Sequence, residues 1–192
     1  LASHVDRLLI GGAMAHTFFL SRGISVGDSL VEKEGIEAAI EVEKVCQEMD
    51  VKLVLPVDVW ITKEGEKAQV QEVKKGIPEG WKALDIGPKS VLLFKEELAS
   101  AKTILWNGPV GAFETPPFDQ GTKEIGQWIA SLNAIKVVGG GDTVAAINAM
   151  GITEKMTHVS TGGGATLEFI EKGTLPGIET LANKQDNGVQ LL

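Results

Sequence analysis

The sequence predicts an α/β fold: a three-layer, doubly wound, mainly parallel sheet (Rossmann-like) with helices on both faces. Two observations lead to this prediction. Five apolar runs, rich in leucine and β-branched residues, mostly do not alternate with polar residues, as is typical of strands buried on both faces. Between them lie segments with helical periodicity, as expected when helices connect parallel strands. The 192 residues, 43% of them hydrophobic, suffice for a domain with a sizeable core.

The elements follow from local patterns along the chain. The predicted strands are the runs at 5–12, 51–61, 102–110, 135–142 and 156–164. Apolar residues recur at spacings of three and four in 32–50 and 118–132, which predicts helices there. A further helix is expected to open at Pro88, because proline suits the first helical turn. The polar segment 62–84 is interpreted as an excursion with a short hairpin. The domain is expected to cover 1–181, with a tail at 182–192.

Charge and composition exclude several classes of function. The net charge of −8 argues against nucleic-acid or membrane-surface binding, because either would favour a basic surface. The single cysteine, Cys46, rules out an internal disulfide. No apolar run is long enough to span a bilayer, and the first residues lack the layout of a signal peptide. A cytoplasmic location is therefore expected.

Glycine-rich loops follow four of the five predicted strands. They are Gly11-Gly12, "WNGP" (106–109), "GGGD" (139–142) and "STGGG" (160–164). In a parallel sheet with right-handed crossovers, the carboxyl ends of the strands share one edge, where ligands bind. Glycine lets a backbone N–H approach a ligand with no Cβ in the way. One such loop is more often only a tight connection, but several at one edge favour a binding site.

The loops at 139–142 and 160–164 predict a site for phosphate and a divalent cation. Each leads into a helix expected to begin near Thr143 or Ala165, and helix N-termini carry free N–H groups and partial positive charge. Asp142 would repel a bare phosphate, but Mg²⁺ is commonly held by one or two carboxylates together with substrate phosphates. Neither a G-x-x-x-x-G-K-[ST] loop nor a complete G-x-G-x-x-G motif occurs.

Six stretches together give the chain a family resemblance. They are "LLIGGAMAHTFF", "LPVDVW", "IPEGWKALDIGPKS", "ILWNGPVGAFE", "VVGGGDTVAAI" and "HVSTGGGATLEFIEKGTLPGIETL". From about residue 3 to residue 181 the chain resembles the carboxyl-terminal, nucleotide-binding domain of phosphoglycerate kinase. The resemblance implies a glycolytic phosphotransferase with a carboxyl-group acceptor. That family exchanges a phosphoryl group between 1,3-bisphosphoglycerate and Mg-ADP, giving 3-phosphoglycerate and Mg-ATP.

The resemblance also implies roles for individual residues on the nucleoside side. Gly11 and Gly12 would border the adenine pocket, with Gly87 on its other side. Glu114 would accept hydrogen bonds from the ribose hydroxyls, although a surface glutamate is the simpler interpretation. The residues of the "WNGP" loop implied to line the site are Asn107 and Pro109.

On the phosphate side, the implied contacts come from the two later glycine loops. Asp142 would hold the magnesium ion, and Thr143 would meet the phosphates unless it serves only as an N-terminal helix residue. The glycines implied to face the phosphates or the transferring group are Gly140, Gly141, Gly163 and Gly164. Catalysis would then consist of positioning and charge stabilisation by amides, chiefly at Gly141, Gly163 and Gly164.

The chain also departs from the family. The family enzyme is about twice as long, and its other lobe binds phosphoglycerate through a basic patch that nothing here resembles. A strand ending in Gly-Gly-Ala-Lys precedes this region in the family, and Met14 stands where a lysine would be needed. We therefore expect an incomplete, inactive piece of a monomeric enzyme, whose open sheet edges allow self-association.

Two other functions remain as alternatives. A dinucleotide-binding domain of an oxidoreductase would share the fold class, but the third glycine and a well-placed acidic residue after the second strand are missing. A non-catalytic nucleotide-binding or scaffold module would keep the same loops, so the sequence does not separate it from the kinase lobe.

Overall fold

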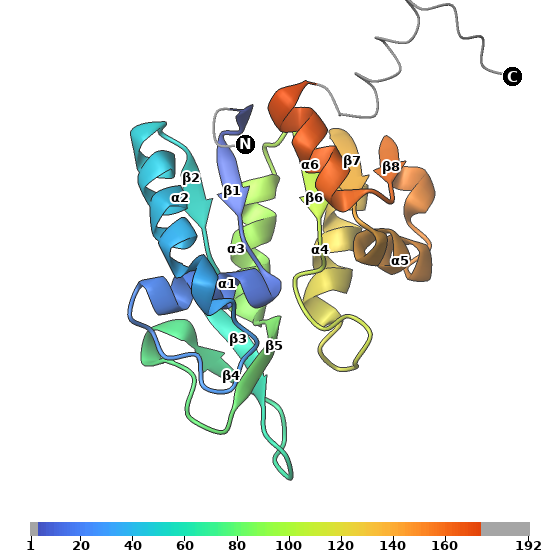
Figure 1. Ribbon diagram of the computed structural model, residues 1–192. Helices are drawn as coiled ribbons and strands as arrows, with labels where there is room; N and C mark the ends of the chain where they lie inside the picture. The colour runs from blue at the N-terminus through green and yellow to red at the C-terminus, as the bar shows by residue number, and fades with distance from the viewer. Residues whose placement is uncertain (1–3, 174–192) are drawn as a thin grey trace, which may run out of the picture.

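The computed structural model describes residues 4–173, which form a mixed α/β fold and confirm the predicted class (Figure 1). The tail at 182–192 lies outside the described residues. Among residues 4–173, no helix is long and apolar enough to cross a membrane. The helices are α1 (Gly12–Ser21), α2 (Ile36–Glu48), α3 (Pro88–Leu98), α4 (Gln120–Ser131), α5 (Gly141–Ala149) and α6 (Gly163–Lys172). The strands are β1 (Arg7–Leu9), β2 (Lys52–Val54), β3 (Asp58–Thr62), β4 (Gln69–Glu72), β5 (Lys82–Ile86), β6 (Thr103–Asn107), β7 (Ile135–Gly139) and β8 (His158–Ser160).

Two groups of parallel strands form the layer between the helices. β1 pairs with β2, and β7 lies between β6 and β8. In the second group Val138 is opposite both Trp106 and Val159, which sets the register of all three strands. Helix α1 packs on α2, and α3 packs on α4. Figure 1 shows α1 and α6 in front of the strands and α3 and α4 behind them, as a doubly wound fold requires.

The strands β1 and β6 are neighbours in Figure 1, but among the described residues they do not pair with each other. The loops that follow them are nevertheless joined, because the N–H of Gly12 donates to the carbonyl of Val110 at 3.1 Å. The two parallel sheets therefore meet at their carboxyl ends, while β1 and β6 each keep one edge without a partner strand in the part of the chain that the structure describes.

The predicted strand at 51–61 is wrong as a single element. Only Lys52–Val54 runs parallel to β1, and the chain then turns through Pro56 into β3. β3 pairs antiparallel with both β4 and β5. Proline lacks the N–H needed to continue a ladder, which fits the break. The β3–β4 hairpin confirms the excursion expected at 62–84, whereas β5 was not predicted as a strand.

Two groups of buried apolar side chains support the sheets. One surrounds α1 and β3 and includes the fully buried Phe19 and Ile61. The other lies between β6–β7 and the helices α3, α4 and α5, and includes Phe94, Val138 and Ile147. Burial of apolar side chains is the main stabilising contribution to such a fold. The carboxyl ends of β6 and β7 thus project from a well-packed base.

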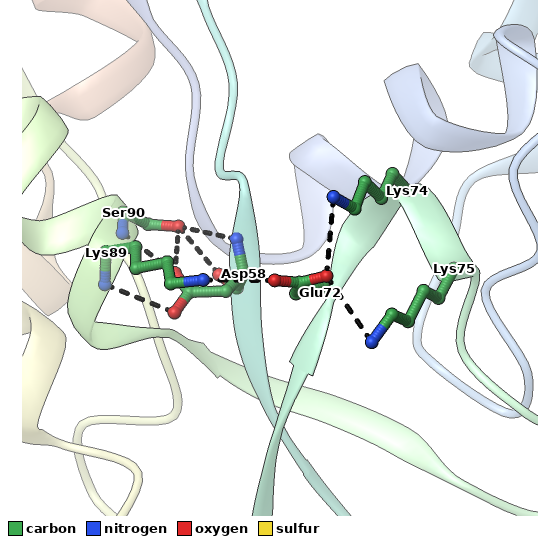
Figure 2. Close-up of polar contacts among 6 residues, drawn as sticks. All are labelled: Asp58, Glu72, Lys74, Lys75, Lys89 and Ser90. Carbon is green, nitrogen blue, oxygen red and sulfur yellow. Dashed lines mark hydrogen bonds and ion pairs between the residues drawn. The ribbon is translucent and has the colours of Figure 1, made fainter.

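The start of α3 is capped by a side chain from β3 (Figure 2). The carboxylate of Asp58 accepts the N–H groups of Lys89 at 3.1 Å and Ser90 at 2.8 Å. The hydroxyl of Ser90 in turn accepts the N–H groups of Val57 and Asp58, each at 2.9 Å. The two bonds to the Asp58 carboxylate satisfy N–H donors of the first helical turn, which no side chain of the N-cap residue caps.

Beside this cap, Glu72 at the end of β4 is surrounded by three lysine side chains. It forms ion pairs with Lys74, Lys75 and Lys89, as Figure 2 shows. The hydrogen bond from Lys89, followed by the charges of the lysines, lowers the pKa of Glu72 to about 2. Since Lys89 belongs to α3, the cluster joins the β3–β4 hairpin to that helix at the solvent surface.

Candidate functional site

Three predicted loops meet at the carboxyl ends of β6, β7 and β8. The N–H of Gly140 donates to the carbonyl of Ser160 at 3.0 Å, which joins the second loop to the third. The side-chain oxygen of Asn107, at the end of β6, would lie 2.7 Å from a Cβ on Gly140 and 3.0 Å from one on Gly163. The Asn107 amide therefore fits between the other two loops only because both positions are glycine.

Thr143 connects the first loop to α5. It is fully buried, and its hydroxyl accepts the N–H of Gly108 at 2.6 Å. This side chain therefore holds the "WNGP" loop in place. Its backbone N–H, together with those of Gly141 and Asp142, belongs to the first turn of α5. The N-cap residue is Gly140, which has no side chain to cap these N–H groups. The first intrahelical hydrogen bond runs from the N–H of Val144 to the carbonyl of Gly140. Gly141 and Asp142 are exposed, so their amides are the groups in this turn that can face an anion.

The backbone conformation and surroundings differ among three glycines of these loops. At Gly140, φ is 92°, a conformation that favours glycine. At Gly141 and Gly164, φ lies outside the left-handed region, and a Cβ would meet nothing within 4 Å. Neither the turn nor internal packing requires glycine there. These two positions, at the starts of α5 and α6, leave bare backbone next to open space.

Asp142 is an exposed carboxylate in the first turn of α5. Among the described residues, no group of three or more His, Cys, Asp or Glu side chains is placed to hold a metal ion. A single carboxylate beside free amides fits a magnesium ion that is bound largely by phosphate oxygens and water, rather than a site built wholly by protein. Its negative charge also favours the helix N-terminus without any metal.

On the other side, the loop after β1 packs against the loop after β6. A Cβ on Gly11 would lie 2.8 Å from the Cγ1 of Val110, and Gly12 has φ of 61° beside the carbonyl of Pro109. Packing and backbone conformation therefore explain both glycines. Glu114, further along the second loop, is exposed. No hydrogen bond or ion pair of its side chain occurs within residues 4–173.

Gly87 also has a packing reason. A Cβ there would overlap the carboxylate of Asp58, and its N–H donates to the carbonyl of Asp58 at 2.8 Å. This glycine is therefore required by the cap of α3, whatever else it contacts.

Two buried polar residues beneath the loop at 108–119 are not among those that the sequence predicted for the site. Asp85 in β5 is 4% exposed, and Thr122 in α4 is 1% exposed. Burial, with smaller contributions from Asp119 and Glu124, raises the pKa of Asp85 to about 7 against two backbone hydrogen bonds that lower it. A single acid inside the apolar run "KALDI" is the signal that could have identified Asp85.

A separate depression lies between α4 and α5. Its volume is about 340 Å³, and its lining is mainly apolar, including Phe113, Ala146 and Met150. The glycine loops at 106–109, 139–142 and 160–164 do not line it, so it is separate from the candidate phosphate site.

Comparisons with known proteins agree on one family. The family model described as phosphoglycerate kinase matches residues 1–173. A phosphoglycerate kinase from Chloroflexus aggregans is 48% identical over 190 residues, which cover 96% of this chain and 48% of that protein. The solved structure of phosphoglycerate kinase from Coxiella burnetii has a TM-score of 0.86 and 41% identity, covering 93% of this chain and 47% of the other. The solved structure of phosphoglycerate kinase from Pyrococcus horikoshii has a TM-score of 0.81 and 32% identity, covering 95% of this chain and 46% of the other. The chain thus spans about half the length of the relatives it matches.

Proposed function

Because the chain belongs to the phosphoglycerate kinase family, we propose that it is the nucleotide-binding lobe of such an enzyme. ADP or ATP would lie along the edge formed by the loops after β1, β6, β7 and β8. The adenine would lie near Gly11, Gly12 and Gly87, and the ribose hydroxyls would donate to Glu114. The residues of the β6 loop that line the site would be Asn107 and Pro109.

The phosphates would face the first turn of α5. The exposed amides of Gly141 and Asp142 would donate to their oxygens, and the Asp142 carboxylate would hold the accompanying Mg²⁺. Gly140, whose N–H donates to Ser160, and the buried Thr143 would border the phosphates and keep the loops in place. When bound, this ion supplies positive charge between phosphate oxygens. The amides of Gly163 and Gly164 would face the transferring group, so this lobe would act by positioning and by stabilising charge.

The observation that carries the proposal is the open space at Gly141 and Gly164. Both begin helices, and neither needs glycine for its backbone conformation or its packing. Two helix N-termini joined by the contact between Gly140 and Ser160 support binding of one polyanion from two sides.

The activity of the whole protein is a wider proposal. We expect reversible phosphoryl transfer between 1,3-bisphosphoglycerate and Mg-ADP, in the cytoplasm, by a monomeric enzyme. The acyl phosphate and 3-phosphoglycerate would bind through a second lobe, and a lysine-bearing strand would lie between β1 and β6. This chain by itself would therefore be inactive, and the edges of β1 and β6 that have no partner strand among residues 4–173 favour self-association.

A titration with and without magnesium tests the nucleotide site. Mg-ADP is added to the 192-residue chain, with heat and amide NMR shifts as readouts. Saturable binding should shift the amides of 139–143 and 160–164. Asp142→Ala should weaken Mg-ADP binding about 10- to 100-fold, a range seen when metal sites are disturbed. The same variant should bind magnesium-free ADP at least as well as the parent chain, because a repelling carboxylate has been removed.

The matched control is Asp6→Ala, which removes an exposed carboxylate just before β1, at the amino end of the strand. It should leave both affinities unchanged. A folded chain that shows no shift at millimolar Mg-ADP would contradict nucleotide binding by this chain and would mean that the lysine-bearing strand is required for it. Saturable binding of NADH, with no competition by ADP, would instead support the dinucleotide-binding alternative.

A further inference from the structure

We propose that Asp85 is a positioning residue that holds the loop at 108–119, and with it Glu114, against β5 and α4. The consequence for nucleotide affinity rests on the proposed function, whereas the effect on the loop does not.

The carboxylate of Asp85 is enclosed by two segments outside its own strand. Its Oδ2 accepts the N–H of Gly121, in the first turn of α4, at 2.8 Å, and its Oδ1 accepts the N–H of Ile86 at 2.9 Å. A Cβ on Gly111 or on Gly121 would overlap this carboxylate. Both glycines therefore leave the space that the Asp85 side chain fills, and one of them belongs to the loop.

Three further bonds fix the loop around the same point. The N–H of Ala112 donates to the carbonyl of Leu84 at 2.7 Å, one residue before Asp85. The N–H of Val110 donates to the hydroxyl of Thr122 at 3.2 Å, next to Gly121 in α4. The carbonyl of Val110 receives the N–H of Gly12 from the loop after β1. The carboxylate thus sits where β5, α4 and the loop converge.

The loop carries residues of the proposed site on both sides of this point. Pro109 lies two residues before Gly111, and Glu114 lies three residues after it. Pro109 is half-buried and Glu114 is exposed, whereas the Asp85 side chain is buried. A shift of the anchor would therefore move Glu114 relative to Gly11 and Gly12, without removing any group that touches a nucleotide.

The charge state of Asp85 adds a measurable signature. Burial raises its pKa, and the facing acids Asp119 and Glu124 raise it further. Lys123 pairs with Asp119, and Lys95 pairs with Glu124 at 2.7 Å, so both neighbouring charges are themselves partly compensated. Because burial outweighs the two backbone hydrogen bonds, the enclosed arrangement favours the neutral acid over the ionised carboxylate. The loop should accordingly be held less firmly above neutral pH than below it.

The experiment compares the parent chain with Asp85→Asn by amide NMR between pH 5.5 and 8.5, without ligand. In the parent chain the amides of Gly111, Gly121 and Glu114 should titrate together near pH 7. In the variant they should take shifted positions and lose this titration. Ser29→Ala is the matched control: it removes the buried acceptor of the Ala83 N–H at the other end of β5. That variant should keep the titration.

Binding of Mg-ADP is then measured for the same proteins. Asp85→Asn should weaken it roughly 2- to 30-fold, the range for residues that act on a site through others. The ratio to the parent chain should shrink as pH rises from 6 to 8, because ionisation of the buried carboxylate loosens the parent loop. Ser29→Ala should leave the affinity unchanged. Loop amides that do not respond in a folded Asp85→Asn variant would overturn the inference.

The two proposals fail in different ways. If neither the parent chain nor the two variants bind Mg-ADP, but the loop amides titrate in the parent chain and not in Asp85→Asn, the nucleotide proposal fails and the positioning role stands. If Asp85→Asn does not fold, the parent titration decides: a common midpoint at Gly111, Gly121 and Glu114 supports the role, and shifts confined to 84–86 contradict it.

Discussion

At the scale of single residues, Gly140 and Gly141 show that adjacent glycines can have unrelated causes. Gly140 has φ of 92° and lies against the side chain of Asn107. Gly141 has an ordinary φ and empty space where a Cβ would be. The sequence "GGG" contains no sign of this difference, because the side chain that crowds Gly140 belongs to the end of β6, more than thirty residues earlier in the chain.

Alanine at the two positions should therefore separate stability from binding. Gly140→Ala should lower the free energy of unfolding by about 1–3 kcal/mol, because alanine is strained at that φ and its Cβ would crowd Asn107. Gly141→Ala should leave it unchanged or raise it by up to about 1 kcal/mol. Mg-ADP affinity should nevertheless fall in Gly141→Ala, whose methyl group would occupy the proposed phosphate space. Urea denaturation and calorimetric titration measure both quantities; equal losses of stability would refute the distinction.

Asp85 makes a second prediction at this scale, on stability against pH. Its pKa of about 7 in the folded protein lies above the ordinary value of 3.8, so folding takes up a proton between these values. Its contribution to stability is therefore full below about pH 4 and is lost as pH rises towards 7. The free energy of unfolding of the parent chain, minus that of Asp85→Asn, should fall over this window with a limiting slope of about 1.4 kcal/mol per pH unit. Parallel pH profiles for the two proteins would show that Asp85 is not the group responsible.

At the scale of elements, local sequence patterns predicted the strands and helices whose positions depend on local periodicity. β6, β7 and β8 lie inside the predicted runs, and α2 and α4 lie inside the predicted helical segments. The run at 51–61 failed because its apolar pattern continues across Pro56, whereas the pairing changes there from parallel to antiparallel. Pairing partners are far apart in sequence, and periodicity does not identify them. For the same reason the cap of α3 by Asp58 could not be predicted.

That cap can be tested through Ser90. Ser90→Ala removes the acceptor for the N–H groups of Val57 and Asp58 and a donor to the Asp58 carboxylate. The N–H of Asp58 is buried, and a buried donor left unpaired costs about 1–3 kcal/mol, so the free energy of unfolding measured with urea should fall by about that amount. Ser131→Ala is the comparison. It removes an exposed hydroxyl that donates to the carbonyl of Trp128, and it should change stability by less than about 0.5 kcal/mol. Equal midpoints for the two variants would count against a role for the cap.

At the scale of the whole molecule, the edge where the loops meet could be predicted. The placement of the β1–β2 pair beside β6 could not. Parallel strands place their carboxyl ends together whatever their order, so the meeting of the loops at 106–109, 139–142 and 160–164 followed from the strand prediction. The join between Gly12 and Val110 depends instead on how the β1–β2 pair is placed against β6. Nothing in the local sequence encodes that placement.

The unpaired edge of β1 gives the last prediction. The N–H of Ile10 donates to the carbonyl of Val54, so the backbone groups of Leu8 and Ile10 face β2, and those of Leu9 face the opposite side. In dilute solution the amide of Leu9 should exchange hydrogen faster than that of Leu8, which serves as its internal control. If chains associate through this edge, raising the concentration should slow exchange at Leu9 selectively, in step with an increase in sedimentation coefficient. Association that leaves the Leu9 exchange rate unchanged would mean that the chains meet through another surface, and a constant sedimentation coefficient would mean that the open edge does not drive association.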